Sequence, residues 1–191
     1  MLGKFFENLL PENIRKGNGA FYTPREIVDY MVDNSLCDYL FTKTSIDKER
    51  LGALISYSKE DDDIAVFTEI ETKKIIDSLY SLTVLDPACG SGAFPIGMLQ
   101  KVVYILQEID PTARLWLNKS TENISPILRR EIETKFSIGS LNYIRKLSVI
   151  QNSIFGIDIQ PIAVEISRLR CFLSLIIEEK VDDNESNRGI N

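Results

Sequence analysis

The feature that most constrains this sequence is a short apolar run that leads directly into two glycines. Residues 82–86 (LTVLD) are aliphatic and β-branched, which predicts a short buried strand. Gly90 and Gly92 follow, and residues 93–108 have the periodicity of a helix that ends at Asp110-Pro111. A strand, a glycine turn and a helix in this order form the nucleotide-binding unit of parallel α/β proteins. The sequence therefore predicts an α/β fold built around this turn.

The glycine turn lacks both common phosphate-binding patterns. A dinucleotide fingerprint needs a third glycine where Pro95 stands, and the Gly-Lys-Ser/Thr ending of a P-loop is missing. Asp86 ends the strand, where a carboxylate would repel a pyrophosphate but can accept hydrogen bonds from an ammonium group. S-adenosylmethionine carries an α-ammonium group and no phosphate, so it suits this turn. The alternative interpretation is a tight turn that binds no ligand.

A second strand and helix follow later in the chain. Residues 154–158 (IFGID) predict a second buried strand, and Pro161 opens a helix with an apolar face. Asp158 ends the strand, where its carboxylate can accept from both hydroxyls of a ribose; the alternative is a helix cap or a surface acid. Such an acid usually lies roughly 20 residues beyond the glycines. Asp158 lies much farther away, so residues 112–149 are predicted to be a helical insertion. The apolar face comprises Ile162, Ile166, Leu169, Leu173 and Ile176.

The first 80 residues predict helices. One covers residues 2–10, and a second begins at Thr23, with Pro24 in its first turn and Glu26 completing a capping box. Two more helices are expected over residues 44–80, on either side of the acidic run 61–63, which is interpreted as a solvated loop and not a metal site. The second helix has an expected apolar stripe of Ile27, Val28, Met31, Leu36, Tyr39 and Leu40.

Composition excludes several classes of site. The sequence has no histidine, so it contains no Ser-His-Asp triad, histidine base or histidine-ligated metal. Cys37, Cys89 and Cys171 are far apart and form no zinc or redox motif; Cys37 and Cys171 are predicted to be small buried apolar residues. No apolar run reaches the length of a membrane span and no signal peptide is present, so we expect no membrane association and a cytoplasmic location.

Two motifs resemble one known family. The string from Asp86 to Phe94 (DPACGSGAF) is similar to the cofactor loop of the DNA adenine-N6 methyltransferases of bacterial restriction–modification systems, in particular the type IIG group. Residues 19–24 (GAFYTP) resemble the N-terminal motif of the same family. The resemblance covers about residues 15–177. It implies a truncated, Rossmann-like S-adenosylmethionine-dependent methyltransferase fold, with an N-terminal helical region over 1–80 and the first half of the α/β domain over 81–191.

The resemblance also implies a cofactor site. The aromatic-Thr-Pro element would contact the carboxylate of S-adenosylmethionine and cover the site, the glycine loop would hold its methionine part, and Ile159 would pack against its adenine. The implied cofactor-binding residues are Phe21, Tyr22, Thr23, Pro24, Asp86, Ala88, Cys89, Gly90, Gly92, Asp158 and Ile159.

The implied activity needs residues that this sequence does not contain. The family transfers its methyl group at an Asn/Asp-Pro-Pro-aromatic loop, and the seven prolines here are all isolated. The resemblance therefore implies a cofactor-binding part without catalytic residues, inactive alone, within a protein that methylates double-stranded DNA. With a net charge of −6, most phosphate contacts should lie outside this segment. The alternatives are a methyltransferase acting on RNA or a protein amide, and a catalytically silent binding or scaffold module.

Overall fold

The computed structural model describes residues 23–58, 66–122 and 141–178. The helix predicted over 2–10, the acidic run 61–63 and the tail from Lys180 lie outside the described residues. The elements in chain order are α3 (Arg25–Thr44), α4 (Lys48–Ile55), α5 (Glu69–Tyr80), β1 (Val84–Asp86), α6 (Ala93–Ile109), α7 (Arg114–Ser120), α9 (Leu141–Asn152), β2 (Ile154–Gly156) and α10 (Pro161–Ile176).

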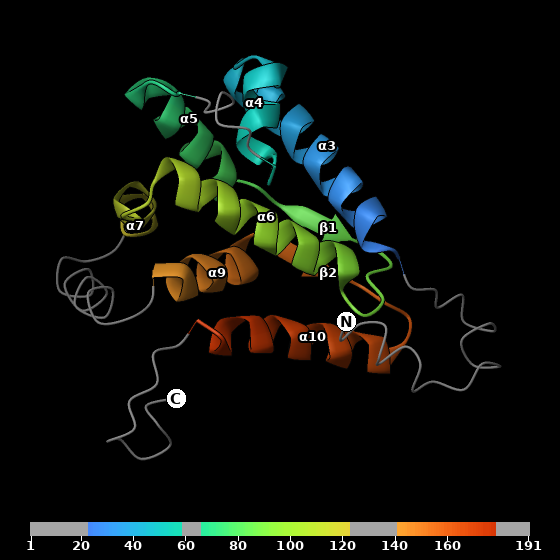
Figure 1. Ribbon diagram of the computed structural model, residues 1–191. Coiled ribbons are helices and arrows are strands. Elements are labelled where there is room, and N and C mark those ends of the chain that lie inside the picture. The colour runs from blue at the N-terminus through green and yellow to red at the C-terminus, as the bar shows by residue number, and fades with distance from the viewer. Residues whose placement is uncertain (1–22, 59–65, 123–140, 179–191) are drawn as a thin grey trace.

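The two strands pair directly with each other. β1 and β2 are parallel, with Val84 opposite Ile154 and Leu85 opposite Phe155. Figure 1 shows α6 crossing the strands, with α9 and α10 on the side away from α3 and α4. The described residues between the strands form helices and turns and include no strand. The expected start of a parallel α/β sheet is confirmed at this level, and the complete Rossmann-like arrangement stays a prediction.

Each strand has one covered and one exposed face. Val84 and Ile154 pack against the hydrophobic core. Their neighbours point the other way, because successive side chains alternate along a strand. Leu85 is 58% exposed and Phe155 is 47% exposed. The prediction of fully buried strands was therefore wrong for one face, which the helices of the described part leave uncovered.

The core lies where α3, α4, α5 and α6 meet. Helix α3 approaches α6 closely because Gly97 has no side chain: a Cβ there would lie 2.6 Å from Val28 Cγ1. The predicted apolar stripe was wrong for Ile27 and Met31, which are about half exposed, because the buried residues of α3 recur at every fourth position. The buried residues of α3 are Val28, Val32, Leu36, Leu40 and Thr44.

The start of α3 differs from the prediction. The helix begins at Arg25, and Pro24 is the N-cap with φ −54° and ψ 146° and without a side-chain hydrogen bond. The capping box expected at Thr23 was therefore wrong, because the extended backbone of Pro24 moves the first turn one residue along the chain.

A complete capping box is found instead at α5. The Thr68 hydroxyl accepts from the Glu71 amide at 3.3 Å, and Glu71 Oε2 accepts from the Thr68 amide at 2.9 Å. Arg50 Nη1 lies 2.7 Å from Glu71 Oε1. The hydrogen bond from Arg50, followed by those from Thr68, lowers the pKa of Glu71 to about 2.

A buried lysine joins α6 to α4. Lys101 is 1% exposed, and its Nζ donates to the Ile55 carbonyl at 2.8 Å. The same nitrogen lies 2.9 Å from Asp33 Oδ1 and 3.4 Å from the centre of the Tyr57 ring. Lys101 therefore satisfies the last carbonyl of α4 and contacts an acid and an aromatic face together.

Candidate functional site

The glycine loop between β1 and α6 contains two residues in the left-handed region. Gly90 has φ 52° and Gly92 has φ 79°, a backbone conformation that costs glycine little. At Gly92 a Cβ would lie 2.4 Å from Ser167 Oγ of α10, whereas at Gly90 nothing lies within 4 Å of that position. Gly92 is thus needed for close packing, and Gly90 borders open space.

The loop continues the pairing of the two strands. The Ile157 amide donates to the Asp86 carbonyl at 2.9 Å, and the Cys89 amide donates to the Ile157 carbonyl at 2.9 Å. The Asp86 side chain also accepts from the Ala88 amide, with 3.1 Å from nitrogen to Oδ1. These bonds fix the turn directly beside the residues that follow β2.

Asp158 joins the glycine loop to the start of α10. Its Oδ2 accepts from the Gly90 amide at 2.8 Å, and its Oδ1 accepts from the Gln160 amide at 2.8 Å. An ionised carboxylate has about four acceptor positions, so both oxygens keep capacity for further donors. The structure therefore brings Asp158 and Gly90 together, although they are 68 positions apart in the chain.

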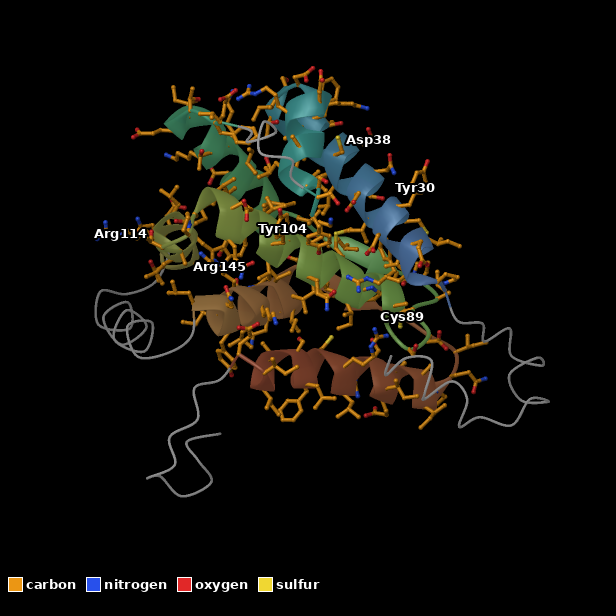
Figure 2. All side chains as sticks on the ribbon, viewed as in Figure 1. Tyr30, Asp38, Cys89, Tyr104, Arg114 and Arg145 are labelled. Carbon is orange, nitrogen blue, oxygen red and sulfur yellow. The ribbon has the colours of Figure 1, made fainter. Side chains whose placement is uncertain are left out.

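Cys89 is a buried residue of the glycine loop and lies against Gly156 of β2. It is 7% exposed, and its Sγ lies 3.0 Å from the position that a Cβ would take on Gly156. Burial, followed by the charges of Asp158 and Asp86, raises the pKa of its thiol, so it stays protonated and is a poor nucleophile. Figure 2 labels Cys89 on the loop at the start of α6.

The other two cysteines differ from the prediction. Cys37 and Cys171 are partly exposed, so the prediction that both are buried was wrong. They pack against the edge of the core, and Cys37 Sγ donates to the Lys48 carbonyl at 3.7 Å. The buried cysteine is Cys89, in the glycine loop.

The remaining predicted residues that the structure describes lie at this end of the molecule. Thr23 and Pro24 are exposed and lie directly before α3, while Phe21 and Tyr22 lie outside the described residues. The first turns of α3 and α6 are in contact, as the spacing at Gly97 shows. Ile159 is 82% exposed beside Asp158. In Figure 1 the start of α3 and the loops after β1 and β2 appear at the same end of the molecule.

Two polar residues of α10 were missed. Arg170 Nη1 donates to the Ser91 carbonyl at 2.7 Å, and Ser167 meets Gly92 one helical turn earlier. Sequence reasoning considered only the apolar residues of this helix, and of these Ile166 alone is buried. The sequence could have indicated them, because Ser167 and Arg170 are polar residues three positions apart and therefore lie on the same side of the helix.

A separate hollow lies at the other end of α6. It has a volume of about 380 Å³ and is lined by Gln107, Pro111, Leu141, Asn142 and Arg145. Arg145, labelled in Figure 2, donates to the carbonyls of Asp110 and Pro111, and burial lowers its pKa. This arginine secures the turn after α6 and does not belong to the glycine-loop site.

Comparison with known proteins finds a relative of this chain. The chain is 32% identical over 199 residues to a protein of Methanocaldococcus jannaschii named "Putative type II restriction enzyme and methyltransferase RM.MjaORFECS2P". The match covers 99% of this chain but 15% of the length of that relative. No protein-family model matches the chain, and no solved structure matches it.

Two further observations concern the described residues. None of their helices is long and apolar enough to cross a membrane. Among them, no group of three or more His, Cys, Asp or Glu side chains is arranged to hold a metal ion.

Proposed function

We propose that this chain is the S-adenosylmethionine-binding part of a DNA adenine-N6 methyltransferase, because it is similar over nearly its whole length to a protein named "Putative type II restriction enzyme and methyltransferase". One observation carries this proposal. The Gly90 amide donates to Asp158 at 2.8 Å, which unites the glycine loop and the acid that the proposed cofactor requires. If the two motifs were chance matches, there would be no reason for the glycine loop and Asp158 to be in contact.

The residues present fit the proposed cofactor. Gly90 leaves open space beside the loop, and the Asp86 carboxylate can accept from the α-ammonium group. Asp158 can accept from the ribose hydroxyls with its remaining lone pairs, and exposed Ile159 offers an apolar surface to the adenine. When bound, S-adenosylmethionine would supply an electrophilic methyl group on its sulfonium. The part of this chain is to bind and orient the cofactor.

The acceptor is proposed to be adenine N6 in double-stranded DNA. The sequence contains no Pro-Pro dipeptide and has a net charge of −6, so acceptor binding and most phosphate contacts are assigned to other parts of a longer protein. The 191-residue chain alone should therefore bind cofactor without methylating DNA. Methylation of duplex DNA by the purified chain would contradict this division of labour.

Calorimetric titration tests the cofactor proposal. We expect the folded chain to bind S-adenosylmethionine and not NAD. Replacing Asp158 with alanine should weaken binding by about 10–100-fold, because a charged acceptor is lost. Asp38→Ala is the matched control, since Asp38 is an exposed acid on α3 that pairs with Lys48 of α4. Binding of NAD, or equal affinity of the Asp158→Ala variant, would refute the assignment.

The acceptor is tested with the full-length protein. Transfer of labelled methyl groups to duplex DNA, with the label recovered at adenine N6, is the expected result. Label recovered in RNA or on a protein amide would show that RNA or a protein, and not DNA, is the acceptor. A third outcome is that the folded chain binds no cofactor and the full-length protein methylates none of these acceptors. That outcome would indicate a binding or scaffold module.

A further inference from the structure

Helix α10 presents two polar side chains to the glycine loop. Arg170 donates from Nη1 to the Ser91 carbonyl at 2.7 Å. Ser167, one turn earlier, occupies the space that a side chain on Gly92 would need, with its Oγ 2.4 Å from the Cβ position. The helix thus contacts two consecutive residues of the loop.

Asp158 binds Gly90, the residue of the glycine loop that precedes Ser91. Its carboxylate accepts from the Gly90 amide, so the amide of Gly90 and the carbonyl of Ser91 are each bound by a charged side chain. Both charged residues come from the segment that begins after β2 and continues into α10. Hydrogen bonds to charged groups are stronger than average, so this segment adds to the bonds that stabilise the conformation of the loop.

The loop needs such an external support. Gly90 and Gly92, on either side of Ser91, are both left-handed, and glycine loses more conformational freedom on ordering than any other residue. A loop that must order when its ligand arrives binds more weakly than one already ordered, because the entropy cost is charged to binding. Fixing the Ser91 carbonyl in advance removes part of that cost.

We propose that Arg170 is a positioning residue for the cofactor, an inference that rests on the proposed function. With Asp158 it holds the glycine loop in the conformation that receives S-adenosylmethionine. It acts through the Ser91 backbone and not through a contact with the cofactor. The Arg170 side chain reaches from α10 to the loop, and its guanidinium donates to the Ser91 carbonyl. This role therefore needs both a long side chain and a donor at its end.

Cofactor affinity gives the first test. Arg170→Met should weaken binding of S-adenosylmethionine about tenfold, the amount expected for loss of one charge-assisted hydrogen bond. Arg170→Lys keeps a cationic donor and should recover part of the loss. Arg168→Met is the matched control: Arg168 lies on the same helix, its side chain is 73% exposed, and it pairs with Glu165. The control should bind as the unmodified chain does.

Amide hydrogen exchange without cofactor gives an independent test. In Arg170→Met, peptides that contain residues 88–93 should exchange at least about threefold faster, since the loop loses an anchor. The Val84 amide, which donates to the Ser153 carbonyl at 2.7 Å, should exchange at its original rate. A general structural role would instead accelerate exchange throughout β1, α6 and α10.

The two tests separate the possible failures. If the unmodified chain binds no cofactor but Arg170→Met still loosens residues 88–93, the proposed function fails while the hold on the loop stands. If Arg170→Met matches Arg168→Met in affinity and exchange, the role of Arg170 is refuted. Uniform acceleration of exchange throughout the chain would also refute it.

Discussion

At the scale of single residues, Gly92 marks the closest approach of the glycine loop to α10. It combines φ 79° with a Cβ position 2.4 Å from Ser167 Oγ. Gly92→Ala should therefore lower the free energy of unfolding by about 2–4 kcal/mol, the sum of a left-handed backbone and an overpacked contact. Urea denaturation measures this loss.

Gly90→Ala provides the control for that substitution. Gly90 is also left-handed, with φ 52°, but has no atom within 4 Å of its Cβ position. Its replacement should cost about 1–2 kcal/mol, from the backbone alone. Adding Ser167→Ala to Gly92→Ala should restore part of the lost stability. Equal costs at both glycines would show that the contact with Ser167 imposes no strain.

Lys101 is the residue on which the junction of α4 and α6 depends. Lys101→Met would remove the only charged group that the structure places on the Ile55 carbonyl within the described residues, and would leave Asp33 without its cation. We expect a loss of about 1–3 kcal/mol in the free energy of unfolding, as for a buried acceptor that loses a charged donor. The exposed Lys73→Met should change stability by less than about 0.5 kcal/mol. A Lys101→Met variant as stable as the control would contradict this role.

At the scale of elements, the start of α5 should make stability depend on pH. The folded-state pKa of Glu71 is about 2, below its ordinary 4.5. A lowered pKa stabilises the fold fully above pH 4.5, and this contribution is lost as the pH falls towards 2. The thermal midpoint should therefore fall less steeply between pH 4.5 and 2 in Glu71→Gln than in the unmodified chain. A slope unchanged in Glu71→Gln would refute the prediction.

Elements defined by local chemistry could be predicted from the sequence. The helix after the glycine loop ends where Asp110-Pro111 predicted, and α10 begins at Pro161. The start of α3 could not be predicted in the same way. Thr23 satisfies the local rule for a helix cap, but the observed first turn depends on the backbone of Pro24. Local rules also cannot show which side of α3 meets α6, so Met31 was wrongly placed in the core.

The candidate site was predictable residue by residue but not as an arrangement. Gly90 was selected as part of the turn after a strand and Asp158 as the last residue of the next strand, which in the structure ends earlier, at Gly156. Their hydrogen bond depends on the parallel pairing of β1 and β2. Arg170 was missed because its partner is a backbone carbonyl, and a sequence does not show where a carbonyl points. Contacts made through space by long polar side chains are the part that sequence patterns omit.

At the scale of the whole molecule, the side of the two-stranded sheet that the described helices leave uncovered should promote self-association. Leu85, Phe155 and Ile157 are each at least 47% exposed, and the first two lie opposite each other on the paired strands. Grouped apolar residues of this kind favour association in water. Sedimentation velocity should show larger species as concentration rises, and Leu85→Thr with Phe155→Thr should shift their appearance to higher concentration. Ile70→Thr, at an exposed position on α5, is the control. A chain that stays monomeric at every concentration would contradict the prediction.

The hydrogen bond from Gly90 to Asp158 also sets an order of events during synthesis. Its two residues are 68 positions apart, so the glycine loop leaves the ribosome first. At about 5–20 residues per second, Asp158 follows after roughly 3–14 seconds. Arg170, the anchor of Ser91, emerges later still. A nascent chain stalled before Asp158 would therefore carry the segments that form α3 to α6 but neither residue that anchors the glycine loop. We expect such a chain not to bind the proposed cofactor.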